Sequence, residues 1–188
     1  MEEKIIFQPD ARIHQTPSSI GLAFDDVYFT ADDGVRLNGW FVPRAGATST
    51  FLWFHGNAGN ISHRVENIKL LHDKVNVNIF IFDYRGYGRS EGTASEEGTY
   101  RDGAAAIELL RKRYGVDPGK LIIFGRSLGA AVAAFCDGGR AFALNARFGD
   151  VTTIRNWSSG ARRICRRSRH SRSTTPIRRW TFRTGRSG

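Results

Sequence analysis

The sequence contains little cysteine and no long apolar run. Its two cysteines, Cys136 and Cys165, are too few for a disulfide framework and lack the spacing of metal ligands. The first ten residues, MEEKIIFQPD, contain neither the basic segment nor the apolar core of a secretory signal. No apolar stretch approaches the roughly 20 residues of a membrane-spanning helix. These absences argue against the disulfide-rich secreted and membrane-spanning classes, so a soluble cytoplasmic protein is expected.

Charge divides the chain into two unequal parts. Residues 1–136 carry 15 Lys and Arg against 16 Asp and Glu, whereas residues 137–188 carry 13 Arg, no Lys and 2 Asp. The net charge of +10 is therefore a property of the last part. From residue 158 onward, Arg, Ser, Thr and Gly predominate without an apolar period, which predicts disorder. We expect an N-terminal extension over 1–21, a folded region over 22–136 and an irregular basic tail over 137–188.

The folded region begins with strand patterns. Residues 26–30 and 35–43 alternate apolar and polar side chains around the turn ADDG, which predicts a β-hairpin. Three continuous apolar runs follow, each typical of a strand buried on both faces of a parallel sheet: residues 50–56, 77–86 and 120–124. Within the tail, only residues 140–148 keep a legible strand period.

Helix patterns separate and follow these runs. One helix is expected from Ser62 to about Asp73, and a third from Ser127 onward. The second is predicted to open with the capping-box pair Thr93 and Glu96 and to end near Gly115. A hairpin followed by β-α-β-α-β-α predicts an α/β fold with a mostly parallel sheet and helices on both faces.

A serine between two glycines lies where the last of these strands becomes a helix. The pattern G-x-S-x-G spans Gly125 to Gly129, with Ser127 at its centre. Small neighbours are needed there because the backbone doubles back and a Cβ would collide. Such a turn raises the Ser127 hydroxyl above the sheet edge and points the Leu128 N–H at a developing oxyanion. A surface serine in an ordinary loop is the alternative, but the flanking strand and helix favour a nucleophile.

A second glycine-rich segment, FHGNAGN, follows an earlier strand of the same predicted sheet. It covers residues 54–60, and in enzymes with a serine elbow this is the place of the other oxyanion donor. The backbone N–H of Asn57 is the candidate donor. The alternative is a glycine-rich turn that binds nothing.

Residues 22–135 resemble the α/β-hydrolase superfamily, and in particular its serine hydrolases. The resemblance is carried by HGNAGN, DYRGYGRSEG and GRSLG, which here are residues 55–60, 83–92 and 125–129. It implies the N-terminal part of an α/β-hydrolase fold, with Ser127 as nucleophile and the N–H groups of Asn57 and Leu128 as the oxyanion hole. It also implies hydrolysis of a small-molecule ester or thioester through an acyl-enzyme, without a metal or organic cofactor. Members include esterases, thioesterases, lipases and peptidases, so the substrate stays open.

The resemblance also implies supporting roles around the serine. His55, Gly56, Gly125 and Gly129 are expected to shape the site. We interpret His55 as a buried histidine bonded to the oxyanion loop, because the family's base lies C-terminal to the serine. Outside this set, Asp83 and Arg85 are expected to fix loops through hydrogen bonds. His63 and His72 are expected to be helix-surface residues or polar residues with satisfied hydrogen bonds.

The family's acid and base have no clear counterpart. They follow the serine in the order Asp or Glu, then His, and after Ser127 the chain offers only Asp137, Asp150 and His170. Asp137 falls at the elbow helix, and His170 lies among arginines. Three functions therefore stay open: a serine hydrolase, an inactive truncated remnant, or non-specific binding of nucleic acid or another anionic surface through the tail.

The change of character near residue 136 suggests a shifted reading frame, with a fused or divergent tail as the alternative. If the later strands of the family are missing, residues 120–124 become a hydrophobic sheet edge. Such an edge is prone to aggregation, so we expect marginal stability or insolubility.

Overall fold

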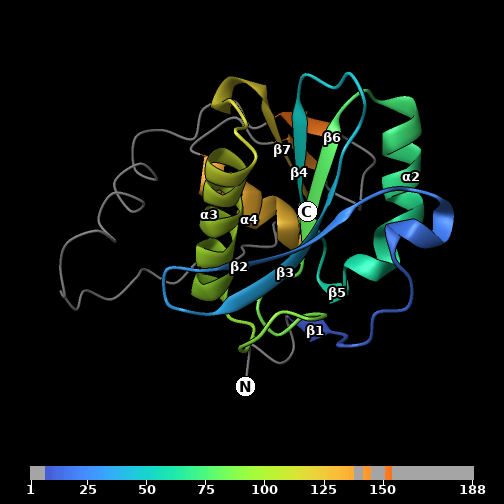
Figure 1. The fold of residues 1–188 in the computed structure, drawn as a ribbon. Helices are drawn as coiled ribbons and strands as arrows, with labels where there is room; N and C mark the ends of the chain where they lie inside the picture. Colours follow the sequence, from blue (N-terminus) through green and yellow to red (C-terminus); the bar gives the residue numbers. More distant parts are fainter. Residues whose placement is uncertain (1–6, 138–141, 145–150, 154–188) are drawn as a thin grey trace, which may run out of the picture.

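Seven strands form one sheet in the computed structural model, which describes residues 7–137, 142–144 and 151–153 (Figure 1). The order across the sheet is β2-β3-β6-β4-β7-β8-β9. Its strands are β2 (Asp25–Thr30), β3 (Arg36–Val42), β4 (Thr50–Phe54), β6 (Asn78–Phe82), β7 (Leu121–Arg126), β8 (Phe142–Leu144) and β9 (Val151–Thr153). A separate parallel pair joins β1 (Gln8–Pro9) to β5 (Ala58–Gly59).

Helices cover both faces of this sheet (Figure 1). The α-helices are α2 (Val65–Lys74), α3 (Glu96–Arg113) and α4 (Leu128–Asp137), and short 3-10 helices span Pro17–Ile20, Ile61–Arg64 and Pro118–Lys120. Strands β6, β4, β7 and β8 run parallel, whereas β2 and β3 form the predicted hairpin and join β6 antiparallel. The predicted α/β architecture with helices on both faces is confirmed, and its sheet is mixed, with three parallel and three antiparallel strand pairs. Among the described residues, no helix combines the length and apolar character needed to cross a membrane.

Side chains of the central strands β4 and β6 pack into two separate hydrophobic cores, one on each face of the sheet. Alternate side chains of a strand point to opposite faces, and in β4 and β6 both sets are apolar. One core combines Leu52, Phe54, Phe80 and Phe82 with Ala106 and Leu110 of α3 and Val132 and Ala133 of α4. The other combines Trp53, Ile79 and Ile81 with Val65 and Ile68 of α2. Continuous apolar runs thus bury the centre of the sheet on both sides.

The start of α3 differs from the expected capping box. Ser95, not Thr93, is the N-cap, and its hydroxyl accepts a hydrogen bond from the N–H of Gly98 at 3.2 Å. Ser95 has extended backbone, which places its oxygen over the first turn, and Glu96 and Glu97 follow at the positive end of the helix dipole. At the other end, Gly115 follows the C-cap residue with a left-handed φ of 62°, as its predicted role requires.

The prediction that residues 120–124 form a sheet edge is wrong only for the end of this run: among the described residues, 121–123 pair with β4 alone, whereas Phe124 has a second partner strand. Phe124, Gly125 and Arg126 pair in parallel with Phe142, Ala143 and Leu144 of β8, and β9 then pairs with β8. The short strand β8 lies in the segment with the legible period, and α4 supplies the crossover that a parallel pair requires. The carboxyl-terminal half of β7, which leads into Ser127, is therefore inside the sheet.

Arg85 ties the loop after β6 to α3 and to the hairpin. Its guanidinium donates to Asp102 at 2.8 and 3.0 Å and to Asp33 at 2.7 and 3.2 Å. The backbone N–H of Arg85 also donates to Asp102, which is fully buried. Burial raises the pKa of Asp102, and the hydrogen bonds from Arg85 oppose that shift. The loop-fixing role predicted for Arg85 is confirmed by these contacts.

This network makes stability depend on pH through Asp33. Hydrogen bonds from Arg85 hold the pKa of Asp33 below its usual value. Such a carboxyl adds stability above its unfolded pKa of about 4, and this is lost as the pH falls through the lower folded value. We expect Asp33→Asn to lower the free energy of unfolding by about 1 kcal/mol at pH 7 and progressively less below pH 4, in urea denaturation. Asp32→Asn, at a more exposed carboxyl, should change little, and a pH-independent loss in Asp33→Asn would contradict the assignment.

Candidate active site

Ser127 occupies a strained backbone position at the end of β7. Its φ is +54°, and it is the one non-glycine residue with positive φ in the part of the chain that the structure describes. It lies between Arg126, the last residue of β7, and Leu128, the first residue of α4, and its side chain is exposed. Left-handed backbone is costly for a residue with a Cβ, so the surrounding structure must impose it. The strand-to-helix elbow predicted from G-x-S-x-G has this geometry.

The two glycines of the elbow are required by close backbone contacts. A Cβ on Gly125 would lie 2.2 Å from the carbonyl oxygen of Gly129. A Cβ on Gly129 would lie 2.0 Å from the carbonyl oxygen of Phe54, the last residue of β4. The start of α4 therefore packs directly on the end of β4, which is the steric reason for both glycines.

The loop formed by residues 55–60 lies beside this elbow. A Cβ on Gly56 would be 3.4 Å from the Arg126 carbonyl oxygen and 3.8 Å from the Ser127 Cβ. His55 is fully buried, and its Nδ1 lies 2.7 Å from the Gly56 carbonyl oxygen, so Nδ1 is the donor. In a trans peptide the C=O and the next N–H point in opposite directions. This hydrogen bond therefore holds the Asn57 N–H on the side facing away from the His55 ring.

His55 also faces a buried carboxyl group. Its Nε2 lies 3.4 Å from Oδ1 of Asp83, which accepts a hydrogen bond from the Ile61 N–H at 2.9 Å. Burial raises the pKa of Asp83. Nδ1 donates to Gly56, and Nε2 faces the Asp83 carboxyl group in an ion-pair contact without a close hydrogen bond. Both ring nitrogens of His55 are thus directed at structural partners, which supports a loop-shaping role for His55 rather than that of a base.

Leu128 begins α4 immediately after the serine. The first N–H groups of a helix have no acceptor within the helix and lie at its positive end. The structure therefore brings the exposed Ser127, the Leu128 end of α4 and the Gly56–Asn57 peptide to one place at the carboxyl edge of the sheet.

Other candidate residues lie elsewhere. The described residues do not include Asp150, His170 or the rest of the Arg-rich segment 154–188. The side chain of Asp137, at the end of α4, is not described either. His63 is partly exposed, whereas His72 is mostly covered. Nδ1 of His72 accepts a hydrogen bond from the Arg44 guanidinium at 3.4 Å, and its Nε2 donates to the Pro43 carbonyl oxygen at 3.3 Å.

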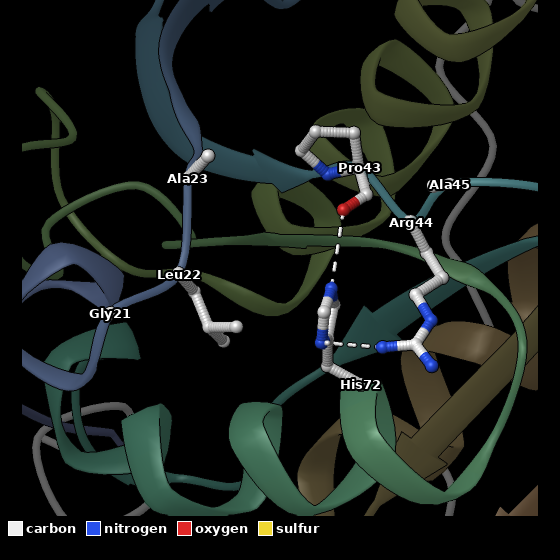
Figure 2. A pocket seen from close by; sticks show the side chains of 7 residues that line it. All are labelled: Gly21, Leu22, Ala23, Pro43, Arg44, Ala45 and His72. Atoms are coloured by element: carbon white, nitrogen blue, oxygen red, sulfur yellow. Dashed lines mark hydrogen bonds between the residues drawn. The ribbon is translucent and has the colours of Figure 1, made fainter.

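His72 lines an open pocket of about 410 Å³ with residues 21–23 and 43–45 (Figure 2). Residues 43–45 follow Val42, which pairs with Ile79 at the amino end of β6. The pocket therefore lies at the opposite edge of the sheet from Ser127, and its lining contains no nucleophile.

One cluster in the described part of the chain has metal-ligating side chains. Ligand atoms of Asp10, His14 and His63 lie within 4.8 Å of one another. However, Nδ1 of His63 accepts the Asn60 N–H at 3.1 Å, so the neutral ring carries its proton on Nε2. That nitrogen faces Asp10 at 3.6 Å, and a protonated nitrogen cannot bind a metal ion. The geometry fits a hydrogen-bonded cluster in which both histidines approach one carboxylate. Sequence reasoning missed it because residues 7–15 have no strand or helix period.

The glycine contacts predict a large effect of one methyl group. Gly129→Ala should lower the free energy of unfolding by about 3 kcal/mol or more, because backbone atoms of β4 and α4 must separate. Gly119→Ala is the matched control, since the nearest atom to its added Cβ is 3.3 Å away on the Asp117 side chain. Urea denaturation of both variants measures the difference, and equal losses would contradict the steric explanation.

The chain resembles known proteins over part of its length. No protein-family model matches the chain. The alpha/beta hydrolase domain-containing protein WAV2 of Arabidopsis thaliana is 38% identical over 141 residues, covering 71% of this chain and 46% of WAV2. The chain thus spans about half the length of the curated relatives that it matches.

Solved structures share the fold described above. The Pyrococcus furiosus esterase Pf2001 aligns with a TM-score of 0.57 and 27% identity, over 69% of this chain and 51% of the esterase. An alpha-beta hydrolase from Vibrio vulnificus aligns with a TM-score of 0.55 and 27% identity, over 63% of this chain and 40% of that protein. With its sheet order, its serine elbow and these likenesses, the chain belongs to the α/β-hydrolase superfamily.

Proposed function

We propose that Ser127 is the nucleophile of a hydrolase that cleaves carboxylic esters or thioesters through an acyl-enzyme. The observation that carries the proposal is the positive φ of Ser127 at the exposed junction of β7 and α4. A serine that only linked a strand to a helix would not need strained backbone. Relatives described as esterases and hydrolases agree with this chemistry.

The reaction follows from the groups placed at the elbow. Ser127 Oγ attacks the acyl carbon, its proton passes to a base, and the carbonyl oxygen becomes an oxyanion. The N–H groups of Asn57 and Leu128 are the proposed donors to that oxyanion. Collapse of the intermediate expels the alcohol or thiol, which takes the proton back. Water then cleaves the acyl-enzyme by the same two steps and releases the acid and the free Ser127.

The base is the part of this chemistry that the described residues do not supply. His55 faces Gly56 and Asp83, His14 and His63 face Asp10, and His72 lies at the opposite sheet edge. By the order of the family, the base and acid follow the nucleophile. In this chain the later candidates are His170 with Asp137 or Asp150.

A catalytically inactive hydrolase is the second candidate, favoured by the absence of a suitably placed base among the described residues. Loss of a triad base lowers turnover by several orders of magnitude, while the elbow and oxyanion donors can persist. The frame-shift hypothesis for the tail belongs to this candidate. The nucleotide sequence tests it, because another frame near codon 136 should then encode the family's Asp and His segments. Phosphate binding by the 13 arginines of residues 137–188 would add only non-specific, salt-sensitive affinity.

Labelling and turnover distinguish these functions. A fluorophosphonate probe should modify Ser127 in the full chain, and Ser127→Ala should abolish the modification. Ser18→Ala, an exposed serine far from the elbow in sequence, should label like the parent chain. Hydrolysis of p-nitrophenyl acetate above the Ser127→Ala background supports the hydrolase. Absence of labelling in the folded chain, with turnover at background, would refute Ser127 as an activated nucleophile and would support the inactive form.

A further inference from the structure

We propose that the N-terminal clasp, residues 7–15, is a positioning element that holds the 55–60 loop in the conformation needed for oxyanion binding. The inference rests on the proposed function of Ser127 and Asn57. It assigns a role to a segment that has no sequence pattern and lies more than 40 residues before the loop that it contacts.

Main-chain pairing joins the clasp to the loop. Gln8 and Pro9 of β1 pair in parallel with Ala58 and Gly59 of β5, and Figure 1 shows the two short strands together at one end of the sheet. The Asp10 N–H donates to the Gly59 carbonyl at 3.3 Å. A two-stranded pair of this length is not stable alone, so other contacts must hold it in place.

Asn60 supplies such contacts from the far end of the loop. Its Nδ2 donates to the carbonyl oxygens of Asp10 at 2.8 Å and Arg12 at 2.6 Å. The Gly88 N–H, from the loop after β6, donates to the same Asp10 carbonyl at 2.9 Å. The clasp therefore bridges the two loops that lie at the carboxyl edge of the sheet.

Side chains secure both ends of the clasp. Phe7 is buried in the core that α3 and α4 cover. Nε2 of His14 lies 2.9 Å from Oδ2 of Asp10, and Nε2 of His63 lies 3.6 Å from the same oxygen. The Asp10–His14–His63 cluster thus ties the clasp to the 3-10 helix that follows the loop.

The contact nearest the proposed chemistry is made by the Asn57 side chain. Its Oδ1 accepts hydrogen bonds from the Gln8 N–H at 3.0 Å and from the Tyr87 hydroxyl at 3.1 Å. Burial raises the pKa of Tyr87 to about 12, so its hydroxyl stays a donor at neutral pH. Two donors converge on one oxygen and restrict the orientation of Asn57.

These contacts act on the peptide that carries the proposed oxyanion donor. His55 holds the Gly56 carbonyl on one side, and Gln8 and Tyr87 hold the Asn57 side chain on the next residue. Rotation of the Gly56–Asn57 peptide would replace an N–H donor with a carbonyl oxygen, which repels an oxyanion. Removing the Gln8 donor should make that rotation easier while leaving Ser127 and its elbow unchanged.

A proline at position 8 tests this role. Gln8→Pro deletes the N–H that Asn57 accepts, and Pro9 already restricts residue 8 to extended backbone that proline can adopt. Gln8→Ala is the matched control, because it removes an exposed side chain and keeps the N–H. In the full chain, Gln8→Pro should lower the rate constant for fluorophosphonate modification of Ser127 by about tenfold, the effect of one lost hydrogen bond. Gln8→Ala should react at the parent rate, and Tyr87→Phe, which removes the second donor, should be slowed like Gln8→Pro.

Two further readouts separate positioning from loss of folding. A positioning defect lowers the modification rate constant at saturating probe with the probe's half-saturation concentration unchanged, whereas partial unfolding lowers the fraction of chains labelled. Amide hydrogen exchange of residues 55–60 should speed up in Gln8→Pro but not in Gln8→Ala. Equal labelling rates and equal exchange in the two Gln8 variants would overturn the role of the clasp while leaving the proposed function standing. An unlabelled parent chain would refute the function, and the exchange data would still decide whether the clasp holds the loop.

Discussion

The close approach of α4 to the end of β4 is the constraint on which the site depends. Gly129 lies so near the Phe54 carbonyl that no side chain fits, and Gly125 meets Gly129 across the turn in the same way. Ser127 lies between these two glycines in the tight turn, and its φ is positive. The strain is sustained by two apolar cores that fix β4, β7 and α4 relative to one another. A packing requirement thus exposes a hydroxyl group at the carboxyl edge of the sheet.

Buried polar groups determine the shape of the loops at this edge. His55 and Asp83 are both fully buried and face each other at 3.4 Å, and each forms a hydrogen bond with neighbouring backbone, at Gly56 and Ile61 respectively. Arg85, on the loop after β6, donates hydrogen bonds to the buried carboxyl group of Asp102 in α3. Such groups are costly unless every partner is in place, so they select one loop conformation rather than adding much stability. Apolar side chains therefore stabilise the sheet, whereas buried polar side chains determine the conformation of the loops at its carboxyl edge.

Much of this could be predicted from the sequence because the signals are local. The apolar runs of β4, β6 and β7 and the glycines around Ser127 each report a burial or steric requirement within a few residues. Errors arose where a decision depended on distant atoms. The N-cap of α3 is Ser95 rather than Thr93, and the end of β7 pairs with the three-residue strand β8. The strand period of residues 140–148 indicated that strand but not its partner.

The sequence by itself determined the α/β class, the order of the main strands and the place of the G-x-S-x-G turn at the end of β7, because these depend on periodicity and on the absence of a Cβ. Only the tertiary structure decided that His55 faces Asp83 and that residues 7–15 reach the Asn57 loop. Those contacts join segments 28 to about 50 residues apart through single hydrogen bonds, which leave no repeating pattern in the chain. Their partners are selected by how the sheet folds, and the sheet brings them together at its carboxyl edge.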